Sequence, residues 1–291
     1  MLKKKHLSLL NLFLLISFFA SAQSAKKYFS LAEKLYETNN YTEAITNYSK
    51  AIELDPKYEK AYVGRALTYE KLNKKTEAVE DYKKAILFSP KEKEYYFHAG
   101  RLLANSENFK EADQMLRKAL ERDKGYEDAI AEEIKVIHKT KDYQYGLTVS
   151  QMGLDVKKTA LSYFNHAVMQ DSLKNYVEAE KEYKNSKYYD SKFIPAYVGL
   201  ALVQVKLNKI NDALAMCEVA LTKDANSVDV FEARSYVYAS KNDYQNALND
   251  ISKVLVSKQS ASLYKARAQF YTTLGQSQNA VNDYSQALKR N

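Results

Sequence analysis

Glycine, proline and cysteine are scarce in this sequence. Its 291 residues include only 7 Gly, 3 Pro and 1 Cys, and no two glycines form a Gly-x-Gly pair. A turn-rich β-sandwich or barrel needs more turn residues, and a glycine loop that binds phosphate needs at least that pair. The lone cysteine, Cys217, has no internal disulfide partner, and no Cys-x-x-Cys pair is present for zinc or redox chemistry. These absences exclude an all-β domain and a glycine phosphate loop.

Concentrated charge is also missing. The net charge is +8, but three lysines fall within residues 1–22, and the remaining 41 basic and 36 acidic residues are interspersed without a long basic run. Proteins that bind nucleic acid normally carry a concentrated basic footprint. The sequence therefore predicts no nucleic-acid partner.

Patterns for catalysis and metal binding are absent as well. His98, His138 and His166 lie far apart, with no His-Glu-x-x-His motif, and there is no Gly-x-Ser-x-Gly elbow. We interpret the histidines as surface or groove residues, and Cys217 as a small buried hydrophobic residue. The sequence predicts no enzyme activity, no metal and no cofactor.

Residues 1–22 have the pattern of a secretory signal peptide. A basic start at residues 3–6 precedes an almost entirely apolar stretch at residues 7–20, and residues 20–22 (Ala-Ser-Ala) form a small-x-small cleavage site. As a retained anchor this stretch would span only about 21 Å as a helix, against about 30 Å of hydrocarbon. We therefore expect cleavage before Gln23, a periplasmic or secreted protein, and no stable membrane insertion after cleavage.

A period of about 34 residues runs through the rest of the chain. A position that we call the alanine position recurs at Ala44, Ala78, Ala112, Gly146, Ala179, Ala213, Ala247 and Ala280. Sixteen residues before it lies an aromatic position, occupied by Tyr28, Tyr62, Tyr96, Ile130, Tyr163, Tyr197, Phe231 and Tyr264. Four residues after it lies a tyrosine position, occupied by Tyr48, Tyr82, Leu116, Ser150, Tyr183, Cys217, Ile251 and Tyr284. The chain therefore consists of eight repeats.

Each repeat contains two amphipathic stripes. In the first repeat, residues 28, 31, 32 and 35 form one stripe and residues 44, 45, 48, 51 and 52 form the other, with the i, i+3, i+4, i+7 spacing of a helix. Turn-tolerant pairs separate the stripes, as at Asn39-Asn40, Asn242-Asp243 and Gly275-Gln276. One pair of helices cannot bury its apolar face alone, so the repeats must stack. The pattern predicts an all-α fold, an α-solenoid of stacked helix-turn-helix repeats.

This pattern resembles the tetratricopeptide repeat family, whose unit is a helix-turn-helix of 34 residues. The resemblance covers residues 25–291 and implies a right-handed superhelix. Its expected organisation is a signal peptide at 1–22, repeats one to three at 23–126, a degenerate fourth repeat at 127–158, and repeats five to eight at 159–291. The fourth repeat departs from the signature, with Ile130, Gly146 and Gly153 at signature positions. It is either a distorted repeat or a hinge.

The resemblance also implies which side chains face a groove, because first helices line the concave side in this family. One apolar set spans repeats five to seven: Phe164, Val168, Val198, Leu202, Val205 and Tyr236. A smaller set covers repeats one to three: Phe29, Tyr36, Val63, Leu67 and Phe97. Contiguous exposed apolar area usually marks an interaction site. The alternative is that tight curvature buries these side chains against one another.

We therefore interpret the protein as a non-catalytic protein–protein interaction scaffold of the cell envelope that holds a peptide or protein segment in its groove. The alternative is a structural subunit of a larger envelope assembly that uses its ends and convex face. In the eighth repeat we expect Tyr284, Ala287 and Leu288 to be uncovered, which predicts docking on a partner or self-association through the C-terminal repeat.

Overall fold

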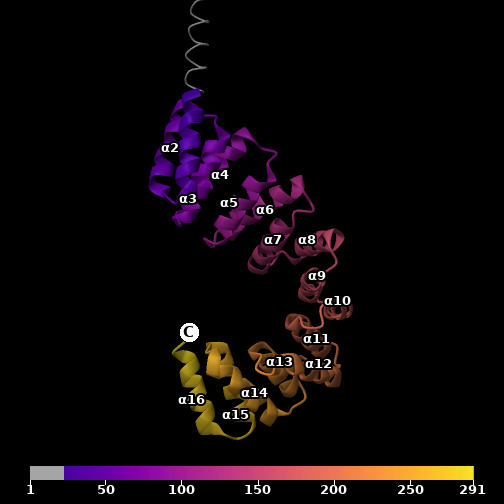
Figure 1. Ribbon diagram of the computed structural model, residues 1–291. Coiled ribbons are helices and arrows are strands. Elements are labelled where there is room, and N and C mark those ends of the chain that lie inside the picture. Colours follow the sequence, from indigo (N-terminus) through magenta and orange to yellow (C-terminus); the bar gives the residue numbers. More distant parts are fainter. Residues whose placement is uncertain (1–22, 291) are drawn as a thin grey trace, which may run out of the picture. The chain divides into compact units, whose positions relative to one another are not determined.

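The structure is a computed structural model that describes residues 23–290, and all regular structure in this range is α-helical (Figure 1). Residues 23–37 are helical. The helices after them are α2 (Tyr41–Leu54), α3 (Glu59–Lys71), α4 (Lys75–Phe88), α5 (Lys93–Ala104), α6 (Phe109–Arg122), α7 (Glu127–Thr140), α8 (Tyr143–Val156), α9 (Ala160–Ser172), α10 (Tyr176–Tyr189), α11 (Ile194–Lys206), α12 (Ile210–Lys223), α13 (Val228–Ser240), α14 (Tyr244–Ser257), α15 (Ala261–Thr273) and α16 (Ser277–Leu288). The sixteen helical segments confirm the predicted eight helix-turn-helix repeats.

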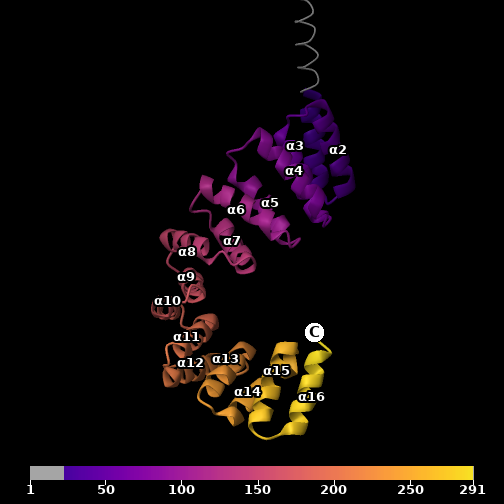
Figure 2. The same cartoon turned by 180° about the vertical axis from the view of Figure 1, so that it is seen from behind.

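The chain divides into two compact units, one that extends to Lys141 and one that begins at Asp142. Within each unit helices pack on their chain neighbours, as α3 does on α4 and α9 on α10 (Figures 1 and 2). The division lies inside the fourth repeat, between α7 and α8. A hinge at residues 127–158 stays a prediction.

The signal peptide predicted at residues 1–22 lies outside the described residues. No helix within residues 23–290 is both long enough and apolar enough to cross a membrane.

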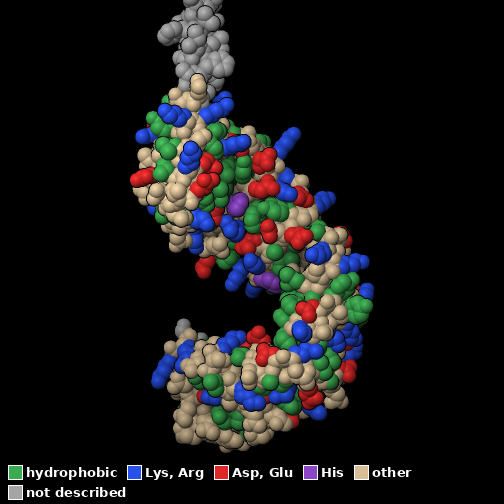
Figure 3. Space-filling model, in the orientation of Figure 1, with side chains coloured by type: hydrophobic (Ala, Val, Ile, Leu, Met, Phe, Trp, Pro, Cys, Tyr) green, Lys and Arg blue, Asp and Glu red, His purple; other side chains and the backbone are tan. Residues whose placement is uncertain are grey.

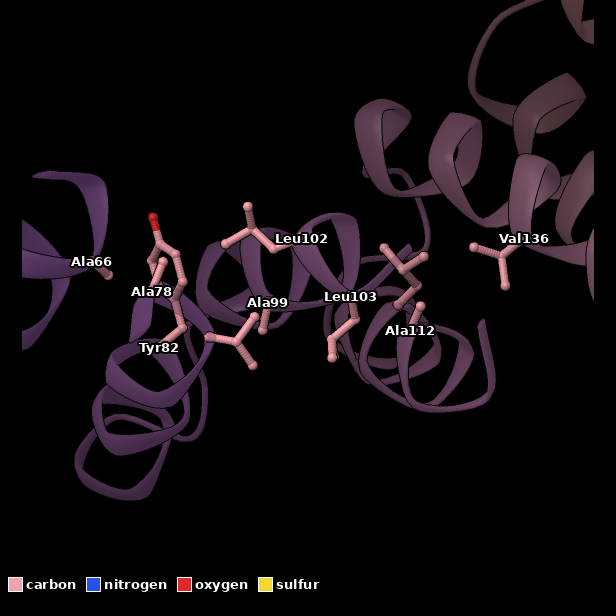
Figure 4. Packing of buried hydrophobic residues seen from close by; sticks show 10 residues of the cluster. Ala66, Ala78, Tyr82, Ala99, Leu102, Leu103, Ala112 and Val136 are labelled. Atoms are coloured by element: carbon pink, nitrogen blue, oxygen red, sulfur yellow. The ribbon is translucent and has the colours of Figure 1, made fainter. Parts of the chain in front are cut away.

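The alanine position lies in the core of each repeat. Its residue is buried in all eight repeats, and so is the small position twelve residues earlier, which includes Ala32, Ala66 and Ala201. Small side chains at both positions let the two helices of a repeat approach closely. Figure 4 shows Ala66, Ala78, Ala99 and Ala112 in such a core, with Leu102, Leu103 and Tyr82 among them.

The aromatic position anchors the loop that joins one repeat to the next. Tyr62 and Tyr96 each donate a hydrogen bond from the hydroxyl to a proline carbonyl six residues earlier, at 3.2 Å. Tyr197 does the same to the Ser191 carbonyl at 2.9 Å. A tyrosine therefore fills apolar space with its ring and also satisfies a loop carbonyl with its hydroxyl.

Three tyrosines at the tyrosine position meet a glycine or a flat ring on the first helix of the next repeat. At Gly64 a β-carbon would lie 2.5 Å from the Tyr48 ring, and at Gly199 it would lie 2.3 Å from the Tyr183 ring. His98 instead stacks on Tyr82, with ring centroids 5.2 Å apart and an interplanar angle of 8°. Consecutive repeats are thus fitted to each other by size.

Three repeats carry a buried ion pair between their helices. Arg65 binds Asp81, Arg234 binds Asp250, and Arg267 binds Asp283, each through two N–H···O bonds of 2.6–2.9 Å. In every pair the arginine lies thirteen residues before the alanine position and the aspartate three residues after it. Two parallel bonds fix the geometry of a pair as well as its charge.

The eighth repeat differs in part from expectation. Tyr284 and Leu288 are exposed, but Ala287 is buried against a core that includes Val254 and Tyr264. The prediction that Ala287 is uncovered is therefore wrong, because its short side chain points into the helix pair. Self-association through this repeat stays a prediction.

Each repeat turns between its helices through one residue with positive φ. These residues, with φ between 56° and 72°, are Asn39, Asn73, Glu107, Lys141, Lys174, Asn208, Asn242 and Gly275. In the first repeat the Asn39 amide donates to the Tyr36 carbonyl and the Asn40 amide to the Leu35 carbonyl. Left-handed backbone favours glycine and asparagine. The predicted turn pairs at 39–40, 242–243 and 275–276 are at this bend.

Replacing the turn glycine tests this bend. A β-carbon on Gly275 would touch nothing within 4 Å, so Gly275→Ala changes only the backbone preference. Left-handed backbone costs an L-residue about 1–2 kcal/mol, offset in part by lower entropy of the unfolded chain. We expect a loss of about 1 kcal/mol in the free energy of unfolding, measured by urea titration. Lys174→Gly is the matched reverse change and should stabilise slightly. A stability gain for Gly275→Ala would contradict the bend described here.

Candidate functional site

A groove of about 570 Å³ opens on the C-terminal unit over α9, α11 and α13. These are the first helices of repeats five, six and seven, and α11 packs against both of the others. Its apolar lining consists mainly of Phe164, Ile194, Pro195, Val198, Leu202 and Tyr236. The three helices thus bring together side chains that are more than seventy residues apart in sequence.

Packing behind the groove fixes its walls. Phe164 lies 5.8 Å from the Tyr183 ring and meets Phe193 edge-on at 5.5 Å, measured between ring centroids. Val198 and Leu202 are half-buried on the core of repeats six and seven. Tyr236 remains 50% exposed. The walls are therefore held by the core while apolar area stays open to a ligand.

Four of the six residues predicted for this surface line the groove, namely Phe164, Val198, Leu202 and Tyr236. Val168 and Val205 do not. Both are half-buried and pack on the same core clusters as the groove residues, Val168 with Phe164 and Val205 with Val198 and Leu202. They lie nearer the C-terminal ends of their helices, beyond the groove.

The smaller predicted set, in the N-terminal unit, is dispersed over two cores. Phe29 and Tyr36 pack against one cluster, and Val63 and Phe97 pack against the next. Phe29 contacts the rings of Tyr48 and Tyr58. Leu67 is half-buried on α3. These residues do form the first-helix surface, yet rings of neighbouring repeats partly cover it.

A charged edge borders the groove, which the apolar pattern did not predict. Asp229 and Glu232 come from the first turns of α13, and Lys258 follows α14. The Lys258 ammonium donates to Glu232 at 2.7 Å, and this bond raises the pKa of Lys258. Glu232 occupies the repeat position of Phe164 and Val198, so the periodicity alone could have placed it here. Elsewhere charges of both signs are intermixed over the face seen in Figure 3.

A polar network takes the corresponding place in the N-terminal unit. The Tyr82 hydroxyl donates to Glu70 at 2.7 Å, and Arg101 donates to the same carboxylate. The His98 ring stacks on Tyr82 and lies 3.7 Å from Glu70. Burial lowers the pKa of His98, although Glu70 opposes the shift. The network links α3, α4 and α5 through the Glu70 carboxylate, although the Nε of Arg101 is buried without a hydrogen-bond partner among the residues that the structure describes.

One serine–histidine pair, of a kind that some enzymes use in catalysis, is buried away from solvent. Ser150 Oγ lies 3.1 Å from His166 Nδ1, between α8 and α9. Ser150 is 1% exposed and His166 is 7% exposed, and burial lowers the pKa of His166. His166 is therefore a core residue, and its interpretation as a surface or groove histidine is wrong. Within residues 23–290, no three His, Cys, Asp or Glu side chains form a group suited to a metal ion.

The comparisons with known proteins agree with this architecture. A family model described as TPR repeat matches residues 32–73, and one described as tetratricopeptide repeat matches residues 59–92, 93–126 and 261–291. A search among curated proteins gives no significant match.

Solved structures share the fold at low sequence identity. A chain of the APC/C hetero-tetramer Cut9–Hcn1 matches with a TM-score of 0.61 and 14% identity over 90% of this chain and 52% of that chain. The C-terminal part of a TPR repeat-containing protein from Cytophaga hutchinsonii matches with a TM-score of 0.60 and 17% identity, covering 78% and 94% of the two chains. MamA from Desulfovibrio magneticus matches at 0.53 and 16%, covering 58% and 96%. This chain thus spans about half of the first of these structures.

The helix pairs, the 34-residue period and these matches show that the molecule is an all-α repeat solenoid. The chain is a tetratricopeptide repeat protein with about eight repeats. Such repeats form scaffolds for protein–protein interaction.

The lone thiol provides a test of the packing around the site. Cys217 occupies the tyrosine position of the sixth repeat, is buried, and has a pKa raised by burial to about 12. The thiolate is the reactive form. At pH 8 we expect native protein to react with a disulfide reagent about a thousandfold more slowly than a free thiol, since the thiolate fraction falls by that factor. Urea-unfolded protein should react at the ordinary rate. Fast labelling of native protein would show that the sixth repeat is open.

Proposed function

We propose that the protein is a non-catalytic interaction scaffold that binds a peptide or protein segment in the groove over α9, α11 and α13. The observation that carries the proposal is the convergence of Phe164, Val198, Leu202 and Tyr236 from three helices on one open groove. Open apolar area of this kind is unfavourable in water and usually serves an interaction.

The size of the groove suits a few side chains of a partner. Full burial of a large apolar side chain is worth about 1.5–3 kcal/mol, from which the cost of ordering a peptide must be subtracted. Two or three such contacts give useful affinity only if the walls are already in place. Here the walls rest on the Tyr183 and Phe193 rings and on the core of repeats six and seven.

Truncating the groove should weaken the partner without unfolding the chain. After the partner has been isolated by affinity capture, Phe164→Ala with Leu202→Ala should raise its Kd about tenfold or more, because about 1.4 kcal/mol is a factor of ten. The matched control is Val168→Ala with Val205→Ala, which removes apolar side chains of the same helices outside the groove. Unfolding curves accompany each titration.

Two outcomes would contradict the proposal. One is an unchanged Kd in the groove variant. The other is a loss of several kcal/mol of stability with the partner retained, since Phe164 and Leu202 would then be core residues and the interaction surface would lie elsewhere.

A structural role in a larger assembly is the second candidate, and one observation favours it. Leu87, Tyr188 and Val256 are 70%, 84% and 83% exposed, and all three lie nine residues after the alanine position. Each is an exposed apolar residue near the C-terminal end of a second helix. Partner binding that survives the groove variant and is lost in Tyr188→Ser would favour this function.

We further propose that the protein is exported to a bacterial-type envelope, on the strength of the pattern in residues 1–22. The mature chain should then begin at Gln23, which intact-mass measurement of protein from its native source would detect. An uncleaved N-terminus recovered in the membrane fraction would refute this.

A further inference from the structure

The tyrosine position holds a tyrosine with a bonded hydroxyl in two repeats of the N-terminal unit. Tyr48 donates to Glu33, and Tyr82 donates to Glu70 at 2.7 Å. Each glutamate lies on the first helix of the same repeat, eleven residues before the alanine position in one case and eight in the other. The buried hydroxyl is thereby satisfied within the repeat, as buried polar groups normally are.

Tyr183 of the fifth repeat departs from this arrangement. Val168 takes the repeat position of Glu33, and Asp171 takes that of Glu70. Asp171 is engaged elsewhere, because both of its carboxylate oxygens accept from the Lys206 ammonium at 2.7 and 2.8 Å. Across residues 23–290, the Tyr183 hydroxyl has no hydrogen-bond partner.

This hydroxyl belongs to the groove. Tyr183 is only 3% exposed, yet it forms part of the groove lining beneath Phe164 and beside Gly199. The absence of a side chain at Gly199 makes room for the ring, since a β-carbon there would lie 2.3 Å from it. Burial raises the pKa of Tyr183, and Asp171 adds to the shift, so the group stays a neutral donor. The ring is buried, but the hydroxyl oxygen is not fully enclosed by protein, so water reaches it, and a ligand acceptor can take the place of that water.

The edge of the groove adds a charge preference. Glu232 is neutralised by Lys258, whereas Asp229 is exposed and makes no ion pair with any described residue. The lining therefore carries one uncompensated negative charge, beside the apolar wall of Val198, Leu202 and Tyr236. Complementary charge contributes more to the choice of partner than to raw affinity.

We propose that the occupant of this groove is a polypeptide segment with a large apolar side chain and a nearby Lys or Arg. The apolar side chain lies on Phe164, Val198 and Leu202. A main-chain carbonyl of the segment accepts the Tyr183 hydroxyl proton, and the cationic side chain pairs with Asp229. This inference rests on the proposed function of the groove and names the chemistry of its partner.

Selection from a random dodecapeptide library displayed on phage tests the proposal with the full chain. Wild-type protein should enrich peptides that combine Leu, Ile or Phe with Lys or Arg a few residues away. Asp229→Lys should shift the enriched charge from basic to acidic. Asp212→Lys is the matched control, because Asp212 is an exposed acidic residue in the first turn of α12, away from the groove. It should leave the selection unchanged.

The Tyr183→Phe substitution removes the hydroxyl donor and keeps the aromatic ring. The Kd of a synthetic copy of the most enriched peptide should rise about three- to tenfold, which is the net worth of one hydrogen bond. Unfolding by urea should be unaffected, since no bond within the protein is lost. Tyr82→Phe is the contrasting variant: it leaves Glu70 without one donor, so it should destabilise the fold and leave peptide binding intact.

The outcomes distinguish this inference from the proposed function. Acidic or uncharged peptides, or a selection that Asp229→Lys does not change, would refute the inference while the groove remains the binding site if Phe164→Ala still weakens the peptides. Unchanged binding in Tyr183→Phe would remove the role of the hydroxyl. Both proposals would be refuted if the enriched peptides bound the Phe164→Ala and Leu202→Ala variants with unchanged Kd, or if no peptide were enriched.

Discussion

The fit between the second helix of one repeat and the first helix of the next is the constraint on which each compact unit depends. A lone helix pair leaves one apolar face in water, so each repeat is stable only against a neighbour. Tyr48 reaches into the space left at Gly64, and Tyr183 does so at Gly199. Cys217, a smaller side chain, lies in one core cluster with Val230 and Ala233 of α13. Size complementarity at this one contact sets how closely successive repeats approach, and therefore how far the first helices stand apart to form a groove wall.

Polar interactions then fix the relative placement of helices that apolar packing alone leaves undetermined. The three bidentate Arg–Asp pairs join the two helices of a repeat, and the buried carboxylates of Asp81 and Asp250 each accept two bonds from one guanidinium. A buried ion pair is weak support for stability but a good determinant of register. The tyrosine hydroxyls differ between repeats: Tyr82 donates a hydrogen bond to Glu70, whereas Tyr183 is part of the groove lining and forms no hydrogen bond with the described residues.

The period of 34 predicted the helix pairs and the turns, and most residues at the repeat positions are buried, because in a repeat the same sequence position meets the same neighbour each time. It did not predict other buried residues such as Val136 and Met169, and Leu31, which was expected in an apolar stripe, is exposed. Departures arose where neighbours differ. Val168 and Val205 obey the first-helix spacing but lie beyond the groove, and His166 is buried with its ring 3.1 Å from the Ser150 hydroxyl of α8. Tyr183 could be recognised as unusual only by comparing its repeat with those of Tyr48 and Tyr82. The missing hydrogen bond depends on three repeat positions at once, that of the tyrosine and those of its two possible acceptors. No single repeat position reveals it.

The turn with positive φ also has a consequence for how this chain can change in length. Within one repeat the bend closes its own backbone hydrogen bonds, as Asn40 does to Leu35, without help from the next repeat. A segment of 34 residues therefore closes its own bend, although its apolar face still needs a neighbouring repeat. Insertion or deletion in whole steps of this size keeps each bend in register, whereas any other step would place a helix interior where a bend is required. The bend therefore permits changes in chain length by whole repeats, and the groove over α9, α11 and α13 depends on only three of them.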